Sequence, residues 1–104
     1  MDSFSGYVIA KKMLVDNKRK VRFMYHEEPF SEYDSGWRFS CGDETQEYYN
    51  NPDNSALYKI ETILEIDPSI EPYLNAEINT AYERENENDD FQYREDFIFG
   101  HEEE

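Results

Sequence analysis

The sequence has almost none of the side chains that form disulfides or structural metal sites. Its 104 residues include one cysteine, Cys41, and two histidines, His26 and His101. A single cysteine excludes an intrachain disulfide, and a structural zinc site usually needs four cysteine or histidine ligands. The acidic runs also lack the ligand spacing and central glycine of a calcium loop. The sequence therefore predicts no metal site, with a weak calcium site in 85–90 as the alternative.

Glycine and long apolar runs are also scarce. The four glycines are scattered, whereas a phosphate-binding loop needs several glycines close together. No apolar stretch approaches the length of a membrane span. The first residues lack the basic region and apolar run of a secretory signal. We expect a soluble cytoplasmic protein that binds no cofactor and contacts no membrane.

Groups suited to catalysis are equally sparse. Cys41 has only His26 as a plausible base, and a cysteine among aromatic residues is typically a small buried hydrophobe. Acidic pairs such as Glu27-Glu28 arise by chance in a chain with 25 acids. The sequence predicts a protein that is not an enzyme, and no catalytic residue is assigned. An unrecognised hydrolase or nucleotide-binding enzyme is the alternative.

Basic residues are few, and they are unevenly placed. Ten lysines and arginines face 25 acids, for a formal net charge of −15. Residues 11–22 hold six basic side chains and one acid, or +5, so the other residues hold −20. Such a chain repels nucleic acid and attracts basic proteins. The acidity serves either solubility or binding. The basic segment either protects an edge strand or docks an acidic partner or the chain's own tail.

Alternating side chains in the first half of the chain predict β-strands. Residues 6–15 have the composition of a strand, and residues 20–26 alternate with a period of two. We expect these two strands to pair as an antiparallel hairpin. A further strand begins at Gly36. The side chains expected on one face of that strand are Trp37, Phe39 and Cys41.

The second half predicts short helices and a return to the sheet. Residues 44–50 follow Asp43, which is a suitable N-cap. The apolar spacing over 60–64 indicates a helical turn. Asp67-Pro68 favours another helix start, because aspartate caps the helix and proline suits its first position. Residues 78–84 alternate and are expected to rejoin the sheet.

These elements predict an α+β fold with a small antiparallel, partly barrel-like β-sheet and two or three short helices. Aromatic residues, 16% of the chain, can supply core volume that the few aliphatic residues do not. Residues 1–84 are expected to form a single domain. Residues 85–104 are expected to be a partly ordered acidic extension: a solvated linker at 85–90, then an extra strand or short helix, then a frayed end at 101–104. Its apolar residues are Phe91, Tyr93, Phe97, Ile98 and Phe99.

The segment 34–39, with the chain's single tryptophan, is the most specific candidate for binding. Trp37 and Arg38 have the composition of an interface hot spot. The other interpretation makes Trp37 a core anchor and pairs Arg38 with a carboxylate. The candidate partner-binding residues are Glu27, Glu28, Asp34, Trp37, Arg38, Asp43, Glu44 and Asp53.

Several short motifs occur in an order that resembles a known bacterial family. They are Gly6-Tyr7-Val8-Ile9-Ala10, Phe23-Met24-Tyr25 with Glu27-Glu28-Pro29, Asp34-Ser35-Gly36-Trp37-Arg38-Phe39, Gly42-Asp43-Glu44 and Asn51-Pro52-Asp53-Asn54. The family was first catalogued as a domain of unknown function and later classed among immunity proteins of polymorphic toxin systems. The resemblance covers residues 6–84. It implies a small β-rich domain with short helices that neutralises a toxin, and it brings no catalytic residues.

Two functions follow from these observations. The first is an immunity protein that binds and neutralises a cognate toxin, with an acidic surface that suits a basic toxin domain. The second is a stand-alone regulatory or housekeeping module that binds another protein. The basic segment and the 85–104 extension are where a partner would be selected, because specificity often lies in variable loops and ends.

Overall fold

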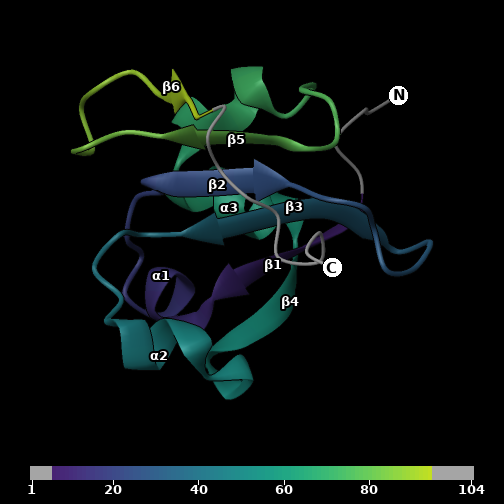
Figure 1. Ribbon diagram of the computed structural model, residues 1–104, viewed down its shortest axis with the longest axis horizontal. Helices are drawn as coiled ribbons and strands as arrows, with labels where there is room; N and C mark the ends of the chain where they lie inside the picture. Colours follow the sequence, from purple (N-terminus) through teal and green to yellow (C-terminus); the bar gives the residue numbers. More distant parts are fainter. Residues whose placement is uncertain (1–5, 95–104) are drawn as a thin grey trace.

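The computed structural model of the protein describes residues 6–94, which form one six-stranded sheet in the order β4-β1-β3-β2-β5-β6 (Figure 1). The strands are β1 (Tyr7–Lys11), β2 (Phe23–His26), β3 (Asp34–Ser40), β4 (Ser55–Lys59), β5 (Thr80–Glu83) and β6 (Gln92–Tyr93). Neighbouring strands are antiparallel except β1 and β3, which are parallel. The predicted α+β class is confirmed. The sheet itself is mixed and open, with β4 and β6 at its two edges.

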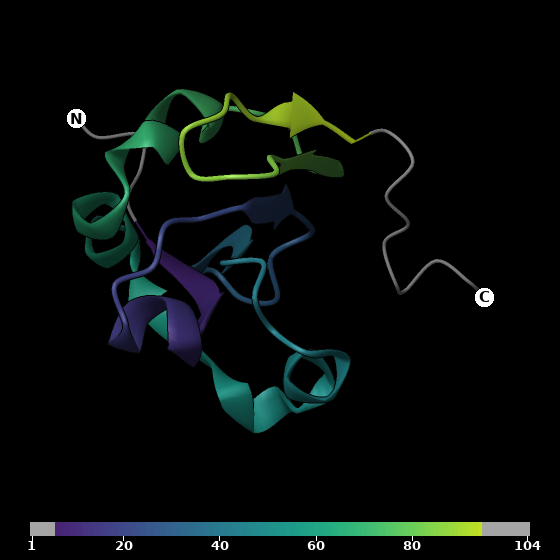
Figure 2. The same ribbon diagram turned by 90° about the vertical axis from the view of Figure 1, so that its left-hand side faces the viewer.

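Short helices connect the strands. They are α1 (Lys12–Asp16), α2 (Gln46–Asn50), α3 (Ile60–Ile66) and the 3-10 helices η1 (Pro52–Asn54) and η2 (Pro68–Tyr73). Figure 2 shows α1 and α3 on the same side of the sheet. Leu14 of α1, Ile63 of α3 and Ile70 of η2 are fully buried against Val8 and Met24 of the sheet. This apolar layer is the core, and the β2–β3 and β5–β6 connections extend beyond it.

The predicted hairpin over 6–26 is wrong. β1 ends at Lys11, the chain turns into α1, and β3 lies between β1 and β2 in the sheet. The apolar run that follows Lys11 suits a buried helical turn as well as a strand, since a short apolar run does not distinguish the two. Leu14 decides the outcome, because in α1 its side chain is fully buried in the core.

The predicted strand around Trp37 is confirmed. Trp37, Phe39 and Cys41 share the covered face and are 3%, 3% and 0% exposed. The Trp37 ring stacks on His26 with centroids 4.5 Å apart, and its Nε1 donates to the Leu74 carbonyl at 3.3 Å. Trp37 is therefore a core anchor, and its side chain is not available to a partner.

Two helix caps were predicted from the local sequence, and the structure confirms one of them. Asp67 caps η2 as predicted, because its carboxylate accepts the Ser69 amide while Pro68 occupies the first position. The predicted cap of α2 is wrong. Thr45, not Asp43, accepts the Tyr48 amide, since the helix begins two residues later than expected.

The chain returns to the sheet as β5, as predicted, and residues 85–90 are exposed. Phe91 is then buried and leads into β6, so the predicted extra strand is present at Gln92–Tyr93. The expectations for Phe97, Ile98, Phe99 and 101–104 lie outside the described residues. The division of the chain at residue 84 stays a prediction.

Candidate protein-binding surface

The side chain of Arg38 organises the base of the β2–β3 loop. Its Nη1 and Nη2 donate to Asp34 Oδ1 and Oδ2 at 2.9 and 2.8 Å, which makes a bidentate pair. Its Nε donates to Glu27. The Arg38 side chain is 8% exposed and that of Asp34 is fully buried. The structure thus brings together three of the predicted site residues, Glu27, Asp34 and Arg38. Asp34 and Arg38 are buried and support the loop from inside.

Asp34 also holds the loop backbone. Its two carboxylate oxygens accept the amides of Gly36 and Phe30, each at 3.0 Å. Burial by itself raises the pKa of Asp34, but the hydrogen bonds from Arg38, Gly36 and Phe30 outweigh burial and lower the pKa below its usual value. The charged form is therefore the form that fits the fold.

The lowered pKa of Asp34 gives a testable pH dependence. A carboxyl whose pKa is lower in the folded state stabilises the protein above its unfolded pKa of about 4, and this stabilisation is lost as pH falls through the folded pKa. The unfolding free energy of wild type should exceed that of Asp34→Asn at neutral pH, and the gap should narrow between about pH 5 and pH 2. Urea titrations of both proteins over this pH range measure the difference in unfolding free energy. A gap that is constant with pH would show that the Asp34 charge contributes nothing.

The outer part of this loop carries exposed apolar side chains. Tyr33 and Phe30 are 69% and 62% exposed, and beside them Leu57 of β4 and Tyr7 of β1 are 51% and 37% exposed. These four residues line one shallow depression of about 340 Å³, which we call the loop patch. The sequence analysis assigned no role to Phe30 or Tyr33 and did not identify this patch. The sequence signal for the patch is a pair of aromatic residues within a turn. No strand or helix periodicity there places these residues in the core.

Asp43 and Glu44 are engaged within the fold. Asp43 forms ion pairs with Arg19 and Arg22, and the hydrogen bond from Arg19 is the largest contribution that lowers the pKa of Asp43. The Glu44 carboxylate accepts the backbone amides of Cys41 and Gly42 at 2.8 and 2.9 Å. Part of the basic segment 11–22 is thus neutralised by Asp43.

Glu28 and Asp53, the remaining predicted residues, are exposed. Glu28 follows β2 in the same loop as the patch, whereas Asp53 lies in η1 and is not among the residues of that loop. Within residues 6–94 neither carboxylate forms an ion pair. The predicted set is therefore not one site: it divides between the β2–β3 loop, the Asp43–Glu44 turn and η1.

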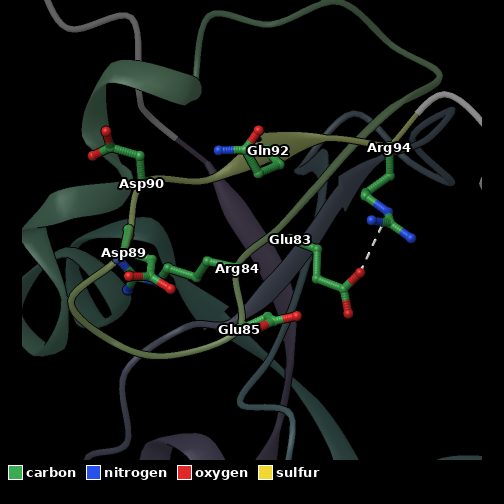
Figure 3. Close-up of a pocket in the computed structure, with 7 residues that line it drawn as sticks. All are labelled: Glu83, Arg84, Glu85, Asp89, Asp90, Gln92 and Arg94. Carbon is green, nitrogen blue, oxygen red and sulfur yellow. Dashed lines mark hydrogen bonds and ion pairs between the residues drawn. The ribbon is translucent and has the colours of Figure 1, made fainter.

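A second surface lies at the β5–β6 connection, where an open, polar hollow of about 540 Å³ is found. Figure 3 shows the side chains that line it: Glu83, Arg84, Glu85, Asp89, Asp90, Gln92 and Arg94. Arg94 pairs with Glu83, so Glu85 and Asp90 give the hollow an acidic character. We call this surface the acidic hollow. The acidic composition of residues 85–104 indicated the charge of this surface but not its shape.

Arg84 forms one wall of the hollow and is itself buried. Its Nη2 donates to Asp67 at 2.8 Å, its Nε donates to the Val21 carbonyl at 2.9 Å, and its guanidinium lies 4.2 Å from the Phe91 ring centroid. The sequence reasoning assigned Arg84 no role. No local signal could reveal it, because its partners Asp67 and Val21 are distant in the chain.

The described part of the chain has one cysteine and one histidine, and both side chains lie within the fold. Between residues 6 and 94, no group of three histidine, cysteine or acidic side chains is arranged to hold a metal ion. Cys41 is fully buried, as predicted, and burial raises the pKa of its thiol. The ring nitrogens of His26 lie 2.9 Å from the carbonyl oxygens of Ala76 and Ser35. No helix in the same range is long and apolar enough to span a membrane.

These features are those of a small acidic α+β domain with an exposed apolar patch at one end of its sheet. A family model, described as the immunity protein Imm33 domain, matches residues 8–95, and the chain belongs to this family. The match extends past residue 84, where the resemblance seen in the sequence ended. Immunity proteins are typically not enzymes. The comparisons found no matching curated protein and no matching solved structure.

Proposed function

We propose that this chain is an immunity protein that acts in the bacterial cytoplasm and neutralises a cognate toxin by binding it. The match of the Imm33 family model to residues 8–95 is the observation that carries the proposal. The match includes the β2–β3 loop and all the residues that line the acidic hollow. Family membership does not name the toxin, so the chemistry of the partner is argued from the charges of this chain.

The charge distribution favours a basic toxin domain. All five arginines of the chain form ion pairs with its own acids. Exposed acids such as Glu61, Glu65, Glu85 and Asp90 form no ion pair within residues 6–94, and the net charge is −15. A surface with this excess attracts a basic partner and speeds the encounter between the two proteins. The acidic hollow, which is open to solvent, is the surface we assign to this steering.

The test screens the products of the genes adjacent to this one for a toxin domain. Co-expression of the chain should restore growth to cells that produce this toxin, and the two purified proteins should form a complex. Because charges exposed to solvent are screened by salt, the association rate should fall about tenfold or more between about 50 and 500 mM salt. Growth that is not restored would contradict the immunity role and favour a stand-alone regulatory module.

A pair of variants separates the acidic hollow from net charge alone. Glu85→Gln with Asp90→Asn removes two charges from the hollow, and Glu61→Gln with Glu65→Gln removes two exposed charges from α3. The first pair should slow association several-fold more than the second pair. Equal slowing would assign the steering to net charge, and a salt-independent rate would remove the electrostatic contribution altogether.

A further inference from the structure

The loop patch gathers most of the exposed apolar side chains of the described structure. Six large hydrophobic residues of the range 6–94 are exposed, and four of them line this one depression. The other two, Ile78 and Tyr93, lie apart from it. Scattered exposed hydrophobes need no explanation, but a contiguous patch marks an interaction site. Tyrosine and other aromatic residues are also the types that carry most binding energy at protein interfaces.

The patch is held in place before any partner arrives. The Tyr7 amide donates to the Tyr33 carbonyl at 2.9 Å, and the Asp34 amide donates to the Ser31 carbonyl at 3.2 Å. The buried Asp34–Arg38 pair secures the base of the loop. A surface that is already ordered loses little conformational entropy on binding, so more of its contact energy appears as affinity.

The charges around the patch indicate the chemistry of its partner. Glu27, Glu28, Glu32 and Asp34 carry four negative charges, and Arg38 and Lys59 carry two positive ones, which leaves −2 at this end of the sheet. Glu28 and Glu32 are exposed and form no ion pair within the described residues. Exposed aromatic rings beside carboxylates match a lysine or arginine side chain, because the ring faces attract cations and carboxylates pair with them.

We propose that the loop patch is the apolar anchor of the toxin interface, and that it receives a toxin segment with a lysine or arginine next to an apolar side chain. This proposal rests on the proposed function, and it adds which surface supplies most of the binding affinity. The patch is at the opposite end of the sheet from the acidic hollow, because β2 and β5 are antiparallel and each surface follows the end of its strand (Figure 1). The two surfaces then have separate kinetic roles.

The hollow is the weaker candidate for the anchor. Its lining is mostly polar, and exposed charges change the association rate more than the dissociation rate. An apolar patch that becomes dehydrated in the complex acts mainly on the dissociation rate. The proposal therefore predicts that the two surfaces are distinguished by which rate constant changes.

The experiment measures the association and dissociation rate constants for the toxin domain from which the chain protects cells in the growth test. The variant Phe30→Ser with Tyr33→Ser should raise the dissociation rate about tenfold or more and leave the association rate within about twofold. Tyr93→Ser, which removes an aromatic residue that is 54% exposed on β6, is the matched control and should change neither rate constant more than about threefold. Thermal unfolding of every variant confirms that the fold is retained. Since both substituted loop side chains are more than half exposed, the fold should be unaffected.

The outcomes separate this inference from the proposed function. If wild type binds the toxin and the Phe30–Tyr33 variant dissociates at the wild-type rate, the patch is not the anchor and the immunity role stands. If wild type neither binds nor protects, the immunity role fails and the anchor falls with it. A concentration-dependent dimer that the same variant abolishes, with toxin dissociation unchanged, would assign the patch to self-association instead.

Discussion

Replacing Gly36 with alanine is expected to destabilise the protein by about 3 kcal/mol or more. Gly36 has φ of +94°, which side chains other than glycine rarely adopt, and an added Cβ would lie 2.3 Å from the Glu27 carbonyl oxygen and 2.9 Å from His26 Cδ2. The first obstacle is the backbone directly after β2, so the chain there would have to move away from β3. Because His26 stacks on Trp37, the disturbance would also reach the core.

Gly42 provides the matched control for this prediction. It has a similar φ of +89°, but the three atoms nearest to an added Cβ all belong to the Arg22 side chain, at 3.2 to 3.3 Å. That side chain can move, so Gly42→Ala should cost about 1 kcal/mol from backbone strain. Urea unfolding of both variants measures the difference. Equal losses would show that strain at positive φ, rather than contact with the backbone, explains the Gly36 effect.

Removing the Asp67 carboxylate is expected to cost about 3–5 kcal/mol, because Asp67→Ala leaves the buried Arg84 without its ion-pair partner. The side chains of Asp67 and Arg84 are 3% and 4% exposed. The same carboxylate accepts the Val21 amide at 2.8 Å and caps η2 through Ser69. One substitution therefore breaks contacts among the chain before β2, η2 and the end of β5.

Two further variants show whether charge or shape explains this loss. Asp67→Asn retains the size and part of the hydrogen bonding, and it should be intermediate between wild type and Asp67→Ala. Asp53→Ala removes an exposed carboxylate and should change the unfolding free energy by no more than about 0.5 kcal/mol. If Asp67→Ala were as mild as Asp53→Ala, the buried pair would not stabilise the fold.

Local patterns predicted the elements whose stability depends on local geometry. The alternation around Trp37 identified β3 and its buried face, because side-chain direction in a strand has a period of two. The Asp67-Pro68 pair identified the start of η2, because helix capping depends on neighbouring residues. The apolar spacing over 60–64 identified α3 for a similarly local reason. Where two local structures suited one apolar run, as after Lys11, the pattern could not choose between them.

The candidate surface was predicted less completely than the fold. The sequence indicated the loop that contains Glu27, Glu28 and Asp34. It did not distinguish the buried side chains that support this loop from the exposed side chains that a partner could contact. Asp34 and Arg38 become supports because they face each other at 2.8 Å in a buried site. Phe30 and Tyr33 stay exposed because they lie in the loop between β2 and β3, outside the buried apolar cluster.

By itself, the sequence determined the α+β class, several element boundaries and the excess of acidic charge, since each depends on composition or on neighbours along the chain. Only the tertiary structure decided that β1 pairs with β3 and β4, that Arg84 meets Asp67, and that Tyr7 and Leu57 adjoin the β2–β3 loop. These contacts join residues far apart in the chain. They form because the apolar face of the sheet has to be covered and buried charges have to be paired, and both requirements act on the whole chain at once.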